Sequence, residues 1–135
     1  LARFCAEVLE NDPRFKDLQN PVLIPIPLHW KRQWKRGFNQ AEELAKAIKA
    51  LTNLPVHKAL RRTRNTQTQT RLGRNERLSN LKNAFSFRKL PRHFDSAILI
   101  DDVFTTGSTA DACAAELKKH APQLENIVVL TALRG

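Results

Sequence analysis

The residue types that could do chemistry in this chain are concentrated between Ala97 and Ala110. Two carboxylates, Asp101 and Asp102, follow an aliphatic run, and behind them come Val103, Phe104, Thr105, Thr106, Gly107, Ser108 and Thr109. Hydroxyl donors beside a glycine let backbone and side chains approach an anion closely. Two adjacent carboxylates instead accept hydrogen bonds from neutral hydroxyls or help to hold a divalent cation. A phosphate, a diol and a cation together predict a ribose 5-phosphate ligand.

These residues need a strand before them and a helix behind them. Ala97–Ile100 has the continuous apolar character of a strand that is buried on both faces, and ligands of open parallel sheets collect where such strands end. A helical pattern from Ser108 to His120 would aim its free N–H groups at the same place. The alternative is an ordinary strand-to-helix turn in which the acidic pair ends the sheet and Ser108 caps the helix.

The remaining patterns alternate between strand and helix. Residues 39–51 have apolar residues at helical spacing, with Asn39 as the predicted N-cap and Glu42 and Glu43 near the positive helix end. A first helix over 3–9 is broken by Asn11-Asp12-Pro13. Short strands are predicted at 22–28, 56–60, 84–87 and 127–132. This order predicts an α/β fold with a mostly parallel central sheet flanked by helices.

Length and composition limit the class of protein. A chain of 135 residues is enough for one domain, and it has no apolar stretch of the ~18 residues that would cross a bilayer. The first residues lack the pattern of a secretory signal, so we expect a cytoplasmic protein. The sequence has no Met, and we therefore expect further residues before Leu1. Cys5 and Cys113 are far apart and indicate neither a disulfide framework nor a zinc site.

Positive charge is concentrated in the middle of the chain. The formal net charge is +10, and residues 29–92 hold 17 Lys and Arg against 3 Asp and Glu. A basic block of this kind fits a nucleic-acid footprint, a wall that binds pyrophosphate, or a solvated face. The charge alone does not separate these three.

Two segments of the basic block add detail. Between residues 25 and 40, a strand leads into Trp30, Trp34 and Phe38, with Arg36 and Gly37 before a helix start. The segment could hold a pyrophosphate through backbone amides and a guanidinium, form one face of a helical turn, or stack nucleic-acid bases. The second segment, 61–85, is polar and predicts a surface loop. It is either inert or a lid whose cations, Arg71, Arg74 and Arg77, close over a polyphosphate.

The whole set of motifs resembles the ComF/GntX family. The resemblance covers most of residues 21–135 and rests on Pro25-Ile26-Pro27-Leu28-His29, Arg36-Gly37-Phe38-Asn39-Gln40, Thr66-Gln67-Thr68-Gln69-Thr70 leading to Arg77 and Asn80, Asn83-Ala84-Phe85, and the stretch from Asp101 to Thr109. The last stretch is similar to the phosphoribosyl pyrophosphate (PRPP) motif of type I phosphoribosyltransferases. The family is linked to competence and to the use of external DNA, and its zinc-ribbon cysteines are absent here, which implies no zinc for these residues.

The resemblance implies roles for particular residues. Asp101 and Asp102 would contact the ribose hydroxyls, and residues 105–109 would surround the 5-phosphate, with Mg²⁺ accompanying PRPP. Arg36 and Gly37 match the pyrophosphate loop, and Arg71, Arg74 and Arg77 the flexible loop. Thr105 stands where some purine-specific relatives have an acid, so it cannot accept a proton from a base.

The expected activity is transfer of phosphoribose from Mg-PRPP to an acceptor that the sequence does not identify. Residues 1–20 would be part of an N-terminal hood segment and 21–135 the core of a single type I phosphoribosyltransferase-like domain. Two alternatives stay open: a regulator that senses PRPP without turnover, and a protein that binds single-stranded DNA through the basic region 29–92. A homodimer is compatible with all three.

Overall fold

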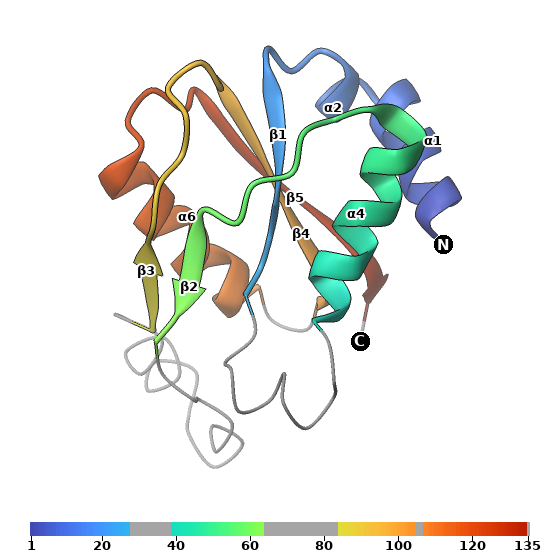
Figure 1. Cartoon of the computed structure of the whole chain (residues 1–135). Coiled ribbons are helices and arrows are strands. Elements are labelled where there is room, and N and C mark those ends of the chain that lie inside the picture. Colours follow the sequence, from blue (N-terminus) through green and yellow to red (C-terminus); the bar gives the residue numbers. More distant parts are fainter. Residues whose placement is uncertain (28–38, 64–83, 105–106, 135) are drawn as a thin grey trace.

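A three-stranded parallel sheet in the order β1-β4-β5 forms the centre of the protein, shown in Figure 1 as a computed structural model that describes residues 1–27, 39–63, 84–104 and 107–134. The strands are β1 (Pro21–Pro25), β4 (Ser96–Phe104) and β5 (Asn126–Arg134). Pairing of β1 with β4 runs from Pro21↔Ser96 to Pro25↔Ile100. Pairing of β4 with β5 continues further, to Phe104↔Arg134. The parallel sheet confirms the α/β fold that the sequence predicts.

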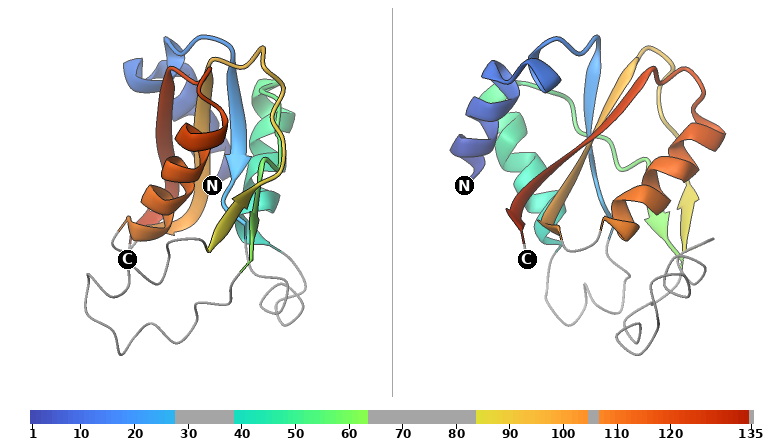
Figure 2. Two further views of the ribbon diagram at one scale, coloured as in Figure 1. Left: turned by 90° about the vertical axis from the view of Figure 1, so that its left-hand side faces the viewer. Right: turned by 180° about the vertical axis from the view of Figure 1, so that it is seen from behind.

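Helices cover both faces of this sheet (Figure 2). On one face Leu23, Ile98 and Ile100 pack in a core with α1 (Ala2–Asn11) and α4 (Gln40–Thr52). On the other face Val22, Ala97 and Leu99 pack in a second core with residues of α6 (Ser108–His120). Successive residues of β1 and β4 therefore enter opposite cores, as the alternation of side chains along a strand requires. Burial on both faces explains why the central strands are almost wholly apolar.

The chain before the sheet confirms the predicted helix break. α1 ends at Asn11, and Asp12 has extended backbone angles (φ −75°, ψ 125°). A further short helix, α2 (Pro13–Lys16), then begins with proline at its first position, and the Asp12 side chain accepts a hydrogen bond from the Arg14 N–H. Proline and aspartate are well suited to these two positions, since proline lacks the N–H that would have no partner there. None of the helices that the structure describes is long and apolar enough to cross a membrane.

A separate two-stranded antiparallel sheet lies beside the central one. It pairs β2 (Leu60–Arg62) with β3 (Phe85–Phe87), in the register Leu60↔Phe87 to Arg62↔Phe85. The predicted strand over 56–60 is wrong in extent, because only Val56 bridges the central sheet, at Leu23, and β2 begins four residues later. The backbone of this segment pairs first with the central sheet, at Val56, and then with β3, from Leu60 on. A local apolar pattern does not indicate such a change of partner.

Candidate functional site

The described residues that could meet a ligand converge on one edge of the molecule. The carboxyl end of β1, the first residues of α4 and α6, and the end of β4 all lie at the lower edge in Figure 1. The joined ends of β2 and β3 lie there as well. In parallel sheets this carboxyl edge is the one where ligands bind, because strand ends and helix N-termini meet there.

Asp101 and Asp102 lie inside β4 rather than behind it. The predicted strand ended at Ile100, whereas pairing with β5 carries β4 on through Asp101↔Thr131. At the same point β1 leaves the sheet, and its last contact is a hydrogen bond from the Ile26 N–H to the Ile100 carbonyl (N···O 2.9 Å). The acidic pair therefore has β5 on one side and the exit of β1 on the other. Both residues are partly exposed.

The alternation along β4 directs the two carboxylates to opposite faces of the sheet. Asp101 continues the series Ala97 and Leu99, which face α6, and Asp102 continues Ile98 and Ile100, which face α4. The position of Asp101 agrees with its effect on the buried Cys113 of α6, whose thiol pKa it helps to raise. The two carboxylates therefore leave β4 on opposite sides.

α6 begins at this edge with a glycine in the left-handed region. Gly107 is the N-cap, with φ 79° and ψ −3°, values that favour a residue without a Cβ. Ser108 is the first helical residue and not the cap, so the capping alternative is wrong. Glycine has no side-chain oxygen, so Gly107 makes no side-chain hydrogen bond to the first turn of α6. The N-terminus of a helix favours an anion through its first N–H groups.

α4 begins at the same edge with a different kind of cap. The Asn39 side chain accepts a hydrogen bond from the Glu42 N–H (3.2 Å) and donates one to the Ile26 carbonyl (3.3 Å). Asn39 is confirmed as the predicted N-cap. Its second hydrogen bond ties the start of α4 to the end of β1.

Several predicted site residues lie outside the described residues. These are Thr105 and Thr106 of the phosphate motif, Arg36 and Gly37 of the pyrophosphate segment, and Arg71, Arg74 and Arg77 of the loop segment. Val103 and Phe104 are described as backbone of β4. Of the predicted residues, the structure brings Asp101, Asp102, Gly107, Ser108 and Thr109 to the same edge.

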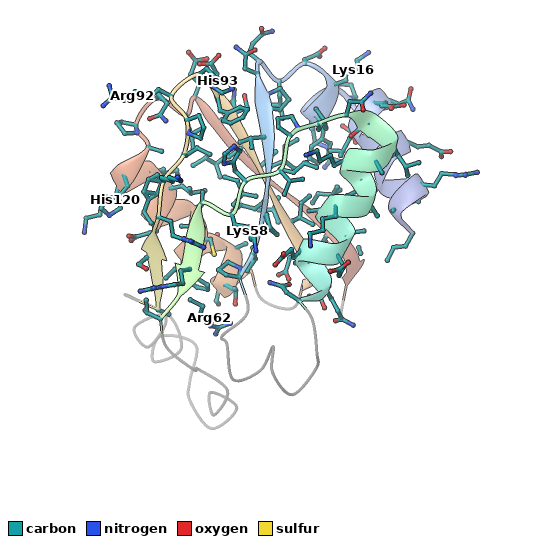
Figure 3. The ribbon with its side chains drawn as sticks, in the orientation of Figure 1. Lys16, Lys58, Arg62, Arg92, His93 and His120 are labelled. Atoms are coloured by element: carbon teal, nitrogen blue, oxygen red, sulfur yellow. The ribbon has the colours of Figure 1, made fainter. Side chains whose placement is uncertain are left out.

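A cavity of about 420 Å³ opens beside this edge, between the end of β1, the start of α4, and β2. Its lining includes four cations and one carboxylate: Lys58, Arg61, Arg62, Arg88 and Glu42. Pro25, Pro27, Asn39, Leu60 and Thr63 complete it. Figure 3 shows Lys58 between α4 and β2, and Arg62 nearer the lower edge. The sequence does not predict this cavity, because its cations come from separate segments of the chain and match no motif.

Glu42 organises the charges on the α4 side of the cavity. Its carboxylate lies 3.1 Å from the Lys58 Nζ and 3.3 Å from the Lys46 Nζ. Burial alone raises the pKa of Glu42, but the hydrogen bonds and charges of Lys58 and Lys46 outweigh it and hold the pKa below its ordinary value. Glu42 therefore stays ionised and holds Lys58 at the cavity wall.

Arg62 of the cavity lining packs on β3 and also influences the buried Cys113 of α6. The Arg62 guanidinium lies over the Phe85 ring, 5.2 Å from its centroid. Burial raises the pKa of the Cys113 thiol far above its ordinary range. To a lesser extent, the positive charge of Arg62 lowers this pKa and the negative charge of Asp101 raises it. Arg62 of β2 and Asp101 of β4 therefore both influence the thiol of Cys113 in α6.

A magnesium ion would need ligands beyond the protein at this edge. The described residues hold no group of three His, Cys, Asp or Glu side chains that could bind a metal. Asp101 and Asp102 supply carboxylate oxygens, which suit Mg²⁺, and this ion commonly takes its other ligands from water and from substrate phosphates. The donor set thus fits a magnesium ion that arrives with a phosphorylated ligand.

Comparison with known proteins gives the family. No protein-family model matches the chain. "Competence protein F" of Haemophilus influenzae is 37% identical over 123 residues, 88% of this chain and 54% of that protein. "DNA utilization protein YhgH" of Escherichia coli K12 is 37% identical over 73% of the chain and 43% of its own length. "Competence protein ComFC" of Bacillus subtilis is 38% identical over 74% of the chain and 40% of its own length. The chain spans about half the length of these relatives, and with this similarity over most of its residues it belongs to the ComF family.

Proposed function

We propose that this protein binds PRPP with Mg²⁺ and transfers its phosphoribose to an acceptor, with release of pyrophosphate. The observation that carries the proposal is that Asp101 and Asp102, near the end of β4, and the N-terminus of α6 behind Gly107 lie at the same edge of the sheet (Figure 1). An acidic pair suits a ribose diol, and helix N–H groups behind a left-handed glycine suit the 5-phosphate. The sequence from 97 to 110 combines both in one strand–turn–helix unit.

The reaction breaks the bond between C1 of the ribose and the pyrophosphate oxygen, which leaves with the electron pair. The acceptor then forms a bond to C1 and loses a proton, while the sugar passes through a cationic transition state. The protein contributes position and charge: carboxylates hold the sugar, and cations stabilise the departing pyrophosphate. No side chain has to form a covalent intermediate. Mg²⁺ would neutralise part of the phosphate charge.

The names of the relatives indicate the cellular process in which this activity would take part. They are competence and DNA utilization proteins, and we propose that this protein likewise acts in the use of external DNA. Loss of turnover with retained PRPP binding would instead favour a regulator that senses PRPP.

A thermal-shift titration tests the proposal. A ligand at a hundred times its dissociation constant stabilises the native state by about 2.7 kcal/mol, which raises the midpoint by roughly 8 °C in a domain of this size. We expect Mg-PRPP to produce such a shift in the wild type and little or none in Asp101→Asn/Asp102→Asn. The control is Asp17→Asn, which removes a carboxylate at the end of α2 and should keep the full shift. Absence of PRPP binding to the wild type in a calorimetric titration contradicts the proposal.

A second candidate function is binding of single-stranded DNA through the basic region. It is favoured by the charge of residues 29–92, with 17 cations against 3 carboxylates, and by the printed names of the relatives. In the described part of that region, the cations Lys58, Arg61, Arg62 and Arg88 gather around one cavity rather than along a continuous groove. This arrangement fits a compact anionic ligand better than a long strand, so we place DNA binding second.

A further inference from the structure

The cavity beside β1 has the charge of a site for a multiply charged anion. The described residues of its lining include four cations, Lys58, Arg61, Arg62 and Arg88, and one carboxylate, Glu42, which together carry a formal charge of +3. A monocarboxylate would leave two of these charges unbalanced, whereas a diphosphate or a nucleotide phosphate would balance them. Guanidinium groups also match phosphate oxygens in geometry, since they donate two parallel hydrogen bonds.

The size of the cavity indicates a small molecule. A volume of about 420 Å³ lies within the usual range of pockets for small ligands, about 300–1,000 Å³. The rigid elements around it, the capped start of α4 and the paired strands β2 and β3, hold the lining residues in place. Lys58 is fixed by its ion pair with Glu42, and Arg62 by its stacking on Phe85. Two of the four cationic groups, Lys58 and Arg62, are therefore positioned before a ligand arrives.

The cavity is distinct from the acidic pair in the described residues. Among the described residues, none of β4 or α6 lines it, and it lies on the side of β1 away from β4, where Figure 3 labels Lys58 and Arg62. We propose that it binds a small molecule through at least two phosphate charges. The phosphates could belong to the pyrophosphate end of a ligand that also reaches Asp101, or to a separate phosphorylated molecule. The proposal does not depend on transferase activity.

Inorganic pyrophosphate is the direct probe, measured by calorimetry without and with saturating PRPP. We expect micromolar-to-millimolar binding to the wild type, weakened at least about tenfold in Arg61→Gln/Arg88→Gln, since two charge-assisted hydrogen-bond donors are lost. Both side chains are exposed, and the hydrogen bond from the Arg88 N–H to the Ala59 carbonyl is a backbone one, so the fold should persist. A melting curve checks this. The matched control is Lys118→Gln/Lys119→Gln, which removes equal charge at the far end of α6.

Each outcome decides one point. Binding that is lost in Arg61→Gln/Arg88→Gln and kept in Asp101→Asn/Asp102→Asn supports the cavity whether or not PRPP binds at β4. If PRPP displaces pyrophosphate, the cavity binds the pyrophosphate end of PRPP. If pyrophosphate still binds in the presence of saturating PRPP, the cavity belongs to a separate phosphorylated molecule. No pyrophosphate binding, or equal weakening in both charge variants, overturns the proposal. Tighter binding of an oligonucleotide that displaces pyrophosphate would also overturn it.

Discussion

Asn39 and Gly107 occupy the same position at the start of two helices but offer different groups to them. The Asn39 side chain satisfies a first-turn N–H and also bonds to the Ile26 carbonyl. Gly107 offers only its backbone, and the Asp111 N–H donates to its carbonyl (2.9 Å). The start of α4 is therefore capped by the side chain of the residue before it, whereas the residue before α6 provides no side-chain cap.

These two residues should respond differently to substitution. Asn39→Ala should lower the free energy of unfolding by about 1 kcal/mol or more, because the N-cap is lost. Gly107→Ala should lower it by about 1–2 kcal/mol, because a Cβ is disfavoured at positive φ. Urea unfolding measures both. Asn39→Ser keeps a cap acceptor without placing a carboxylate against the Ile26 carbonyl, and Gly107→Asn tolerates the left-handed region, so each should lose less than the alanine variant. Equal losses within either pair would contradict these assignments.

At the scale of elements, α6 packs against the central sheet through the buried side chain of Cys113. This side chain is fully buried among residues of β1, β4 and β3, and burial raises its thiol pKa well above 9.0, its ordinary value. The native state therefore keeps its proton at a pH where the unfolded chain has lost it. Stability from this thiol is complete below the unfolded pKa and is lost as the pH rises above it.

An alkaline unfolding series tests this point. The free energy of unfolding should fall above about pH 9, by up to about 1.4 kcal/mol per pH unit for the one thiol. Cys113→Ala should be less stable at neutral pH because of the cavity it leaves, and its stability should decline less steeply with pH. An unchanged slope in the variant would show that other groups cause the alkaline loss.

The sequence predicts an element well when neighbouring residues determine it, and poorly when pairing with a distant segment determines it. Periodic apolar residues placed α4 and α6 to within one residue, and Asn39 marked the start of the former correctly. The end of β4 was missed, because strand pairing with β5 continues through two carboxylates that look like the end of a strand. The cavity could not be predicted, because Lys58 and Arg88 become neighbours only when β2 and β3 pair.

At the scale of the whole molecule, charge is unevenly distributed along the chain. Residues 28–38 and 64–83 carry nine Lys and Arg and one Glu. The described residues that flank both segments lie at the edge that holds the acidic pair and the cavity (Figure 1). The described residues that flank these basic segments therefore lie together at one edge of the fold. Such a concentration attracts anions to that edge before any specific contact forms.

Salt dependence separates the two candidate functions at this scale. If single-stranded DNA contacts three phosphates, its affinity should fall about twentyfold between ~50 and ~200 mM salt. Trp34→Ala should weaken binding of a short oligothymidine further, through lost base stacking, and Asp102→Asn should leave it almost unchanged. Fluorescence anisotropy measures both. Affinity that does not vary with salt would exclude the DNA-binding function.

The hydrogen bonds that close the base of the β2–β3 pair have a consequence for how this family can vary. The Thr63 N–H and Oγ1 both donate to the Ala84 carbonyl, at 2.7 and 3.1 Å, so the two ends of segment 64–83 are joined independently of what lies between them. The entropy of closing a chain grows slowly with its length, by about 0.6 kcal/mol for each doubling. Insertions or deletions between Thr63 and Ala84 should therefore cost the body of the protein little. Evolution could exchange this segment for others without rebuilding the sheet, and so change what the protein recognises.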